Sequence, residues 1–243
     1  MKPIWIFVVG TYRTGSTTQY LLTEAIVERT LHGIGIGYEN EAKLKKFDKD
    51  EHGRYVVAKV FKYLPETSEQ GRKFLEEGRL KAVGTTRDPR DIVVSMRERS
   101  KDLGNADWSF QQTVTRDFPV WLDQFIKWTS LGRKLVLVTR FEDMILDLER
   151  EVRRIARHLA VGVSNELVRE IASEFTLSAQ KRRKERFLAR KNKNDGAREH
   201  PMLPAIPGSR FGTTGHWRDW LTLAEEALVR RHARSYMARW KYI

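Results

Sequence analysis

Short apolar runs recur along the chain, separated by longer segments whose apolar residues recur at helical spacing. Unbroken apolar runs predict strands covered on both faces, as in a parallel sheet, because such strands lose the polar alternation of a one-sided sheet. The amphipathic segments between them predict helices that cover the sheet. The expected strands lie at 5–10, 55–61, 80–84 and 134–138. The expected helices lie at 15–27, 65–75, 92–103, 110–131, 146–159, 164–175 and 223–240.

This alternation of strands and helices predicts the fold class: one α/β domain over 1–243, with a central parallel sheet flanked by helices. A chain of 243 residues is long enough for one domain with a sizeable core, and it shows no internal repeat or second domain boundary. Ligands of such folds bind at the carboxyl ends of the strands. The loops that follow the four strands are therefore expected to share one edge of the sheet. The glycine-rich stretch 32–37 is interpreted as a flexible turn.

Basic residues outnumber acidic ones, 45 to 32, which gives a net charge of +13. This excess predicts an anionic partner: a polynucleotide, an acidic glycan, a membrane surface or a nucleotide. The chain contains no cysteine, which excludes disulfides and favours a cytoplasmic protein. Its first apolar run is typical of a buried strand and not of a signal peptide. No stretch approaches the ~20 apolar residues of a membrane span, so we expect a cytoplasmic protein that does not engage a membrane.

Two segments allow two interpretations each. Trp121, Phe125 and Trp128 recur at helical spacing, which is typical of a core-facing stripe, and one edge of the stripe could also wall a substrate pocket. The basic run 181–198 is either a solvated segment or part of a basic flap, over about 178–209, that covers an acidic ligand.

A strand, a glycine-bounded loop and a helix follow one another at the start of the chain. The strand ends at Gly10, and the helix opens after Gly15. The N–H groups at a helix start lack internal partners, and glycine lets the backbone approach a ligand, so this arrangement predicts a phosphate-binding loop. The two glycines have the spacing of a Walker loop, but Ser16 stands at its lysine position. The loop cation is Arg13 instead, which argues against the Mg²⁺-dependent mode of a kinase or ATPase.

Four segments, in the right order, resemble the sulfotransferase family. Tyr12–Thr17 resembles the 5′-phosphosulfate-binding loop of that family, and Arg87–Ser95 resembles its 3′-phosphate-binding segment, an arginine followed eight residues later by a serine. Arg210–Thr222 is similar to its C-terminal R-K-G-x-x-G-D-W-K-N-x-F-T element, and Phe141–Met144 is similar to its Y-E-D segment. The resemblance covers most of the chain and implies the P-loop-NTPase-like fold of the sulfotransferases.

The resemblance implies transfer of a sulfuryl group from 3′-phosphoadenosine 5′-phosphosulfate (PAPS) to a hydroxyl acceptor. The product would be 3′,5′-adenosine bisphosphate (PAP), and no metal is expected. Arg13 would stabilise the charge that builds on the bridging oxygen, an electrostatic role because arginine stays protonated. Lys59 would help to neutralise the sulfuryl oxygens, while Arg90 and Asp91 are expected to form local salt links. The residues expected to bind the donor are Arg13, Thr14, Gly15, Ser16, Thr17, Thr18, Arg87, Ser95, Arg210 and Gly212.

The chain departs from the cytosolic members of the family on the acceptor side. Phe61 stands where those members carry a histidine base, so the resemblance does not name the general base. Glu39 and Glu41 are the carboxylates to test first as catalytic bases, since a glutamate in a cleft can take a hydroxyl proton. His32 is an alternative. Three more departures alter contacts near the donor or the base: Thr18 for an adenine-stacking tryptophan, Phe141 for a tyrosine and Phe211 for a lysine.

Two other functions stay open at this point. An atypical P-loop nucleotide-dependent phosphotransferase would need Mg²⁺, and no convincing Walker-B aspartate ends an apolar strand. A nucleic-acid-binding protein would bind in a salt-dependent manner, and no recognised binding motif accompanies the basic residues. The sequence does not specify the acceptor, a hydroxyl-bearing small molecule or a glycan. It also leaves open the adenine contacts and the oligomeric state.

Overall fold

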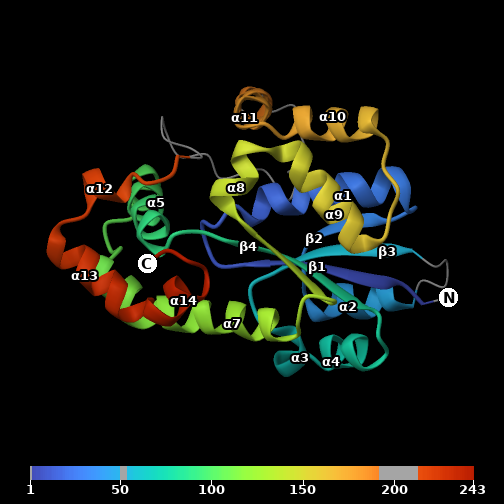
Figure 1. Ribbon diagram of the computed structural model, residues 1–243, viewed down its shortest axis with the longest axis horizontal. Helices are drawn as coiled ribbons and strands as arrows, with labels where there is room; N and C mark the ends of the chain where they lie inside the picture. The colour runs from blue at the N-terminus through green and yellow to red at the C-terminus, as the bar shows by residue number, and fades with distance from the viewer. Residues whose placement is uncertain (1, 50–53, 192–212) are drawn as a thin grey trace.

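The computed structural model describes residues 2–49, 54–191 and 213–243, and its centre is a parallel sheet (Figure 1). Five strands pair in the order β2-β3-β1-β4-β5, all in the same direction. The predicted α/β class with a central parallel sheet is therefore confirmed. The strands are β1 (Ile4–Gly10), β2 (Ile34–Tyr38), β3 (Tyr55–Val60), β4 (Leu80–Thr86) and β5 (Val136–Arg140).

Helices cover both faces of this sheet (Figure 1). In that view α1, α8, α9 and α10 lie above the sheet, while α2, α4, α7 and α14 lie below it. The helices of the described residues are α1 (Ser16–Thr30), α2 (Glu41–Asp48), α3 (Leu64–Thr67), α4 (Glu69–Glu76), α5 (Pro89–Asp102), α6 (Phe110–Gln112), α7 (Phe118–Ser130), α8 (Phe141–Leu146), α9 (Leu148–Leu159), α10 (Asn165–Glu174), α11 (Leu177–Lys191), α12 (Trp217–Trp220), α13 (Leu223–His232) and α14 (Arg234–Arg239).

The central strand β1 contributes to two hydrophobic cores, one on each face. Successive side chains of a strand point to opposite faces, so Trp5 and Phe7 pack with α4 and α7, whereas Ile6 and Val8 pack with α1 and α9. All four side chains are fully buried. This explains why the run carries no polar alternation, and it fixes the end of β1 at the centre of the carboxyl edge of the sheet.

The turn predicted for 32–37 is wrong, because this stretch contains the edge strand β2, which pairs with β3. The glycines of β2 leave room for side chains of α1. A Cβ atom on Gly35 would overlap the Tyr20 hydroxyl and the Glu24 carboxylate. The Tyr20 hydroxyl also accepts the N–H of Gly37 at 2.9 Å. The glycines thus allow a strand to pass close to two large side chains.

Four predicted helices differ in detail from the observed ones. The helix predicted over 65–75 is divided into α3 and α4. The segment 110–131 contains α6, a π-helical turn (Thr113–Asp117) and α7. The π turn precedes Pro119, which lacks the N–H needed to continue an α-helical ladder. The closing helix is divided into α13 and α14 around Ala233, and α8 forms a separate helix before α9.

The expected flap is described only in its first part. Residues 177–191 form α11, and 192–209 lie outside the described residues. Within the described ranges, the helices are all too short or too polar to cross a bilayer.

Candidate functional site

The loop between β1 and α1 lies at the carboxyl edge of the sheet, between the ends of β3 and β4. Its geometry requires both glycines. A Cβ on Gly10 would stand 2.8 Å from the Thr14 hydroxyl oxygen, and a Cβ on Gly15 would overlap the ring of Phe141. Gly15 also has a φ of 87°, in the left-handed region that favours glycine. No side chain caps α1 at Gly15, so the first N–H groups of the helix are available to an anion.

Arg13 connects this loop to two residues of the predicted 3′-phosphate segment. Its Nε donates to the Ser95 hydroxyl at 3.0 Å, and its carbonyl accepts from Nη1 of Arg87 at 2.9 Å. Arg13 itself has a φ of 64°, a conformation that costs energy in a residue with a Cβ and is common at functional sites. Burial, with the nearby Arg87, lowers the pKa of Arg13 to about 10. The loop cation is therefore a half-buried, oriented guanidinium.

Arg87 follows the end of β4 and is 7% exposed. Its Nη2 donates to the Thr213 carbonyl at 2.8 Å, and its guanidinium stacks on Phe141 at 4.5 Å. Its Nε is buried without a hydrogen-bond partner, and no described carboxylate forms an ion pair with it. Burial lowers the pKa of Arg87. Because guanidinium offers five N–H groups and two are used, this buried cation has donors left for an anion.

Lys59, near the end of β3, is 3% exposed. Its ammonium donates to the Thr17 hydroxyl at 2.7 Å and lies over the rings of Tyr38 and Phe61, at 5.1 and 5.4 Å from their centroids. Burial, and then the charge of Arg13, lowers the pKa of Lys59 to about 7. The structure therefore brings Arg13, Thr17 and Lys59 close together, and their roles toward a donor stay predictions.

The remaining loop hydroxyls have distinct partners. The Thr14 hydroxyl donates to the Thr11 carbonyl at 2.9 Å, which stabilises the loop itself. Ser16 is buried in the first turn of α1. The Thr18 hydroxyl donates to the buried Gln180 side chain at 3.3 Å. Thr18 and Gln180 also line a cavity of about 270 Å³, whose apolar walls are Ile145, Leu148, Phe175 and Leu177.

The two predicted base candidates lie in different surroundings. Glu39 comes directly after β2, is half-buried, and its N–H donates to the Lys59 carbonyl at 3.1 Å. Burial raises the pKa of Glu39. Glu41 is an exposed residue at the start of α2 that accepts from the Ser68 hydroxyl at 2.8 Å. His32 precedes β2 and so lies at the opposite, amino edge of the parallel sheet.

Aromatic rings line the edge of the sheet beside Lys59. Tyr12 stacks on Phe61 at 4.5 Å and lies 4.7 Å from Trp121, while Tyr38 lies 5.7 Å from Phe61. Tyr12 and Tyr38 are 43% and 45% exposed. Trp121 is the outer edge of the predicted aromatic stripe, whose other members are buried in the core. The core-facing role predicted for the stripe is therefore confirmed, and the substrate-pocket role considered for its edge stays a prediction.

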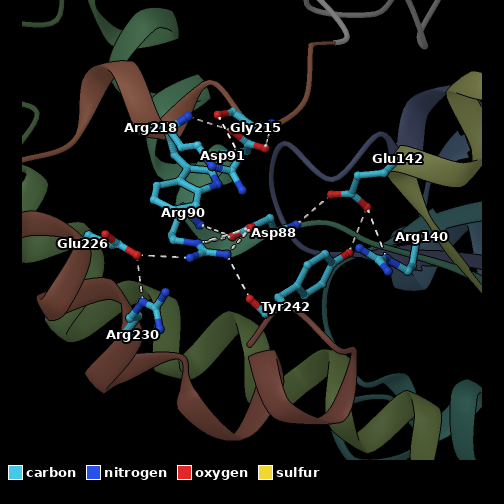
Figure 2. A network of polar contacts seen from close by, with 11 residues as sticks. Asp88, Arg90, Asp91, Arg140, Glu142, Gly215, Arg218, Glu226, Arg230 and Tyr242 are labelled. Atoms are coloured by element: carbon cyan, nitrogen blue, oxygen red, sulfur yellow. Dashed lines mark hydrogen bonds and ion pairs between the residues drawn. The ribbon is translucent and has the colours of Figure 1, made fainter.

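A polar network surrounds Asp88, Arg90 and Asp91 (Figure 2). Arg90 forms the expected local salt link to Asp88 at 2.7 Å, and it also contacts Glu226 at 3.2 Å. The salt link expected for Asp91 is wrong, because this carboxylate accepts backbone N–H groups of the segment 213–217. Arg210 and Gly212 lie outside the described residues.

Further hydrogen bonds around Arg87 could not be predicted from the sequence. Glu142 accepts the Asp88 N–H and the Tyr242 hydroxyl, both at 3.0 Å. The Tyr236 hydroxyl forms a short hydrogen bond with Thr86 and accepts the N–H of Arg87 at 3.4 Å. A glutamate and two tyrosines far apart in the sequence carry no local pattern that would have linked them to Arg87.

Comparison with known proteins identifies the class of protein to which this fold and site correspond. The sulfotransferase domain family matches residues 3–241, nearly the whole chain. The chain therefore belongs to the sulfotransferase family. It is 26% identical to human sulfotransferase 2B1 over 168 residues, which are 65% of this chain and 44% of that protein. The match thus spans less than half of the length of that curated relative.

Solved structures show the same fold. A retinol dehydratase in complex with androsterone and PAP is similar over 98% of this chain and 81% of that chain, with a TM-score of 0.65 and 18% identity. A mouse sulfotransferase complexed with PAP is similar over 95% of this chain and 85% of that chain, with a TM-score of 0.63 and 18% identity. The predicted sulfotransferase fold is therefore confirmed.

Proposed function

We propose that this protein is a PAPS-dependent sulfotransferase that transfers a sulfuryl group to a hydroxyl acceptor and releases PAP. The observation that carries the proposal is the position of Arg13. It lies in the loop at the start of α1 and is hydrogen-bonded to both Ser95 and Arg87. The two similar crystal structures are complexes with PAP, which agrees with a ligand that has two separate anionic ends.

The donor would be bound at both of its anionic ends. The N–H groups at the start of α1 and the hydroxyls of Ser16 and Thr17 would bind the 5′-phosphosulfate. Arg87 and Ser95 would bind the 3′-phosphate, because Arg87 is a buried cation that has no ion-pair partner among the described residues. The family resemblance adds Arg210 and Gly212 to this end. The free energy of burying Arg87 would be recovered in full only when the anion is bound.

In the transfer step, the acceptor oxygen would form a bond to sulfur in line with the bond that breaks. The breaking bond joins sulfur to the bridging oxygen of the donor, and its electron pair would remain on that oxygen as PAP leaves. Arg13 would stabilise this charge, and Lys59 would stabilise the sulfuryl oxygens. Preorganised donors of this kind are worth several kcal/mol, since they need no reorganisation during the reaction.

Glu39 would take the proton of the acceptor hydroxyl. It follows the strand beside Lys59 and is half-buried. Its pKa is raised by burial, which makes it a better base than an ordinary exposed carboxylate. Glu41, exposed and bonded to Ser68, is the weaker candidate for this role.

The cavity beside Thr18 would hold the adenine. It opens next to the residue that directly follows the phosphate-binding loop, and apolar side chains including Phe175 and Leu148 form its walls. Gln180 and Thr18 supply amide and hydroxyl groups at its polar end. An aromatic wall with a few polar groups is the usual lining of a site for a planar base.

The rings of Tyr12, Phe61 and Trp121 would contact the body of the acceptor. These rings lie beside Lys59, so a hydroxyl compound with an apolar or aromatic body fits this side better than a highly charged glycan. The excess of basic charge lies elsewhere on the chain and does not change this expectation for the acceptor.

Calorimetric titration with PAP, compared with ATP plus Mg²⁺, tests the proposal. We expect PAP to bind tightly without Mg²⁺ and ATP with Mg²⁺ to bind weakly. Binding of ATP with Mg²⁺ but not of PAP would overturn the proposal in favour of a phosphotransferase. Salt-dependent binding of polynucleotide without binding of PAP would overturn it in favour of a nucleic-acid-binding protein.

A further inference from the structure

Asp91 in the first turn of α5 binds a segment that lies far away in the sequence. Its two carboxylate oxygens accept the backbone N–H groups of Gly215 at 2.7 Å and Trp217 at 3.1 Å (Figure 2). The side chain is 3% exposed. A buried carboxylate is costly unless hydrogen bonds satisfy it, so this position is tied to the segment 213–217.

Arg87 and Arg90, which are close to Asp91 in the sequence, contact the same segment. The guanidinium of Arg90 lies 3.8 Å from the ring centroid of Trp217, and Arg218 lies 4.5 Å from the same centroid. Arg87 donates from Nη2 to the Thr213 carbonyl at 2.8 Å. Residues 87–91 therefore fix the segment at its start and at its end.

This arrangement also constrains Arg87. One of its terminal nitrogens is directed by the Arg13 carbonyl and the other by the Thr213 carbonyl. The carbonyl of Thr213 keeps its place only while the segment that carries it is fixed, and Asp91 makes two hydrogen bonds to that segment. With both terminal nitrogens directed, the orientation of the unpartnered Nε is also set.

We propose that Asp91 is a positioning residue for donor recognition: it fixes the segment 213–217 so that the Thr213 carbonyl orients Arg87 toward the 3′-phosphate. The inference rests on the proposed function. It assigns to Asp91 no contact with the donor. Its role is to select nucleotides that carry a 3′-phosphate over those that lack one.

The test compares PAP with 5′-AMP, which lacks the 3′-phosphate, by calorimetry on the wild type and on Asp91→Asn. The asparagine has the same size, but its amide nitrogen cannot accept an N–H, so one of the two bonds to the segment is lost. We therefore expect the preference for PAP over AMP to fall about tenfold or more, with AMP affinity nearly unchanged.

If Asp91 had only a structural role, its substitution would lower the affinities for PAP and for AMP alike. The ratio of the two affinities therefore separates a structural role from a positioning role. Asp48→Asn is the matched control: Asp48 is also a shielded carboxylate, paired with Arg79 and Lys73 at the end of α2. It should leave the ratio unchanged. If Asp91→Asn fails to fold, Gly215→Ala perturbs the segment from its other side, because Gly215 has a φ of 77° and a Cβ would lie 2.8 Å from Arg218.

An unchanged ratio in a folded Asp91→Asn, or in Gly215→Ala where Asp91→Asn does not fold, overturns this inference while the proposed function stands. A wild type that does not prefer PAP to AMP overturns the donor assignment itself, and this inference with it.

Discussion

The Nε of Arg13 donates to the hydroxyl of Ser95 at 3.0 Å across 82 positions of sequence. Eight residues of helix would place Ser95 roughly 12 Å beyond Arg87, at about 1.5 Å per residue, so their spacing alone does not bring them to one ligand. Arg13 connects them instead, since its carbonyl accepts from Arg87. The loop between β1 and α1 and the segment 87–95 therefore form one continuous hydrogen-bonded unit.

Removal of the Arg13 side chain should abolish most of the transfer and leave much of the PAP affinity. Loss of one preorganised donor to a developing charge typically costs 10²–10³ in kcat, whereas Arg87 and the start of α1 still bind the product. The measurement is steady-state transfer from PAPS together with calorimetry of PAP for Arg13→Ala. Arg13→Gly is the matched variant, because glycine adopts the φ of 64° without strain. Equal losses in both variants assign the effect to the side chain, and normal turnover in either would show that Arg13 is not the catalytic cation.

Stability should depend on pH through Lys59. Its pKa is lowered by burial from 10.5 to about 7, so below pH 7 the amine is charged in both the folded and the unfolded chain and the full cost of burial is present. Between about pH 7 and 10.5 the folded protein releases this proton while the unfolded chain keeps it, and stability rises with pH across that window. Lys59→Met should therefore be more stable than the wild type at pH 6, by a margin that shrinks toward pH 9. Denaturant unfolding at both pH values measures this.

The control for that experiment is Lys45→Met, on the exposed side of α2. The free energy of unfolding of Lys45→Met should differ little from that of the wild type at both pH values. If the gain in unfolding free energy of Lys59→Met over the wild type grew with pH, the pKa of Lys59 would not be lowered in the folded protein.

Gly15 and Gly132 offer a matched test of the loop, since both have a φ of 87°. A Cβ on Gly132 would meet nothing within 4 Å, whereas one on Gly15 would overlap Phe141. Gly132→Ala should cost about 1–2 kcal/mol from backbone strain alone. Gly15→Ala should cost a further 1–3 kcal/mol from overpacking and should also weaken PAP binding. Equal unfolding free energies for the two variants would mean that Phe141 moves away at no cost.

Glu39→Gln should lower kcat by roughly 10²-fold or more, as expected for loss of a general base, with PAP affinity unchanged. Glu41→Gln serves as the control and should remain near the wild-type rate, because that carboxylate is exposed and bonded to Ser68. A base must be deprotonated to act, so the wild-type rate should fall as the pH is lowered through the raised pKa of Glu39, and this limb should be absent from the residual activity of Glu39→Gln. Normal rates in both variants would discard a glutamate base.

Most of the sheet and the loop between β1 and α1 could be predicted because their signals are local. An unbroken apolar run such as 5–9 has few alternatives to a buried strand, and the glycines at 10 and 15 limit the loop to one kind of geometry. Strand β2 could not be predicted in this way. Its glycines disfavour a strand by propensity, and they are required only because Tyr20 and Glu24 of α1 pack against it.

The supporting contacts of the site could not be predicted for a related reason. Asp91 has basic neighbours in the sequence, which favours a local salt link, but the fold brings two N–H groups from residues 215 and 217 to its carboxylate. Likewise, nothing near Arg87 in the sequence indicates Tyr236, which accepts its N–H. Such partners are set by the tertiary arrangement and not by local pattern.

Arg87 and Lys59 are buried cations that form no ion pair with a carboxylate of the described residues. An anion that binds at the site would supply the missing counterion and would thereby stabilise the folded protein. Sulfate or phosphate in a buffer would act as a partial substitute for the nucleotide, so the melting temperature is a property of the protein and its anion together.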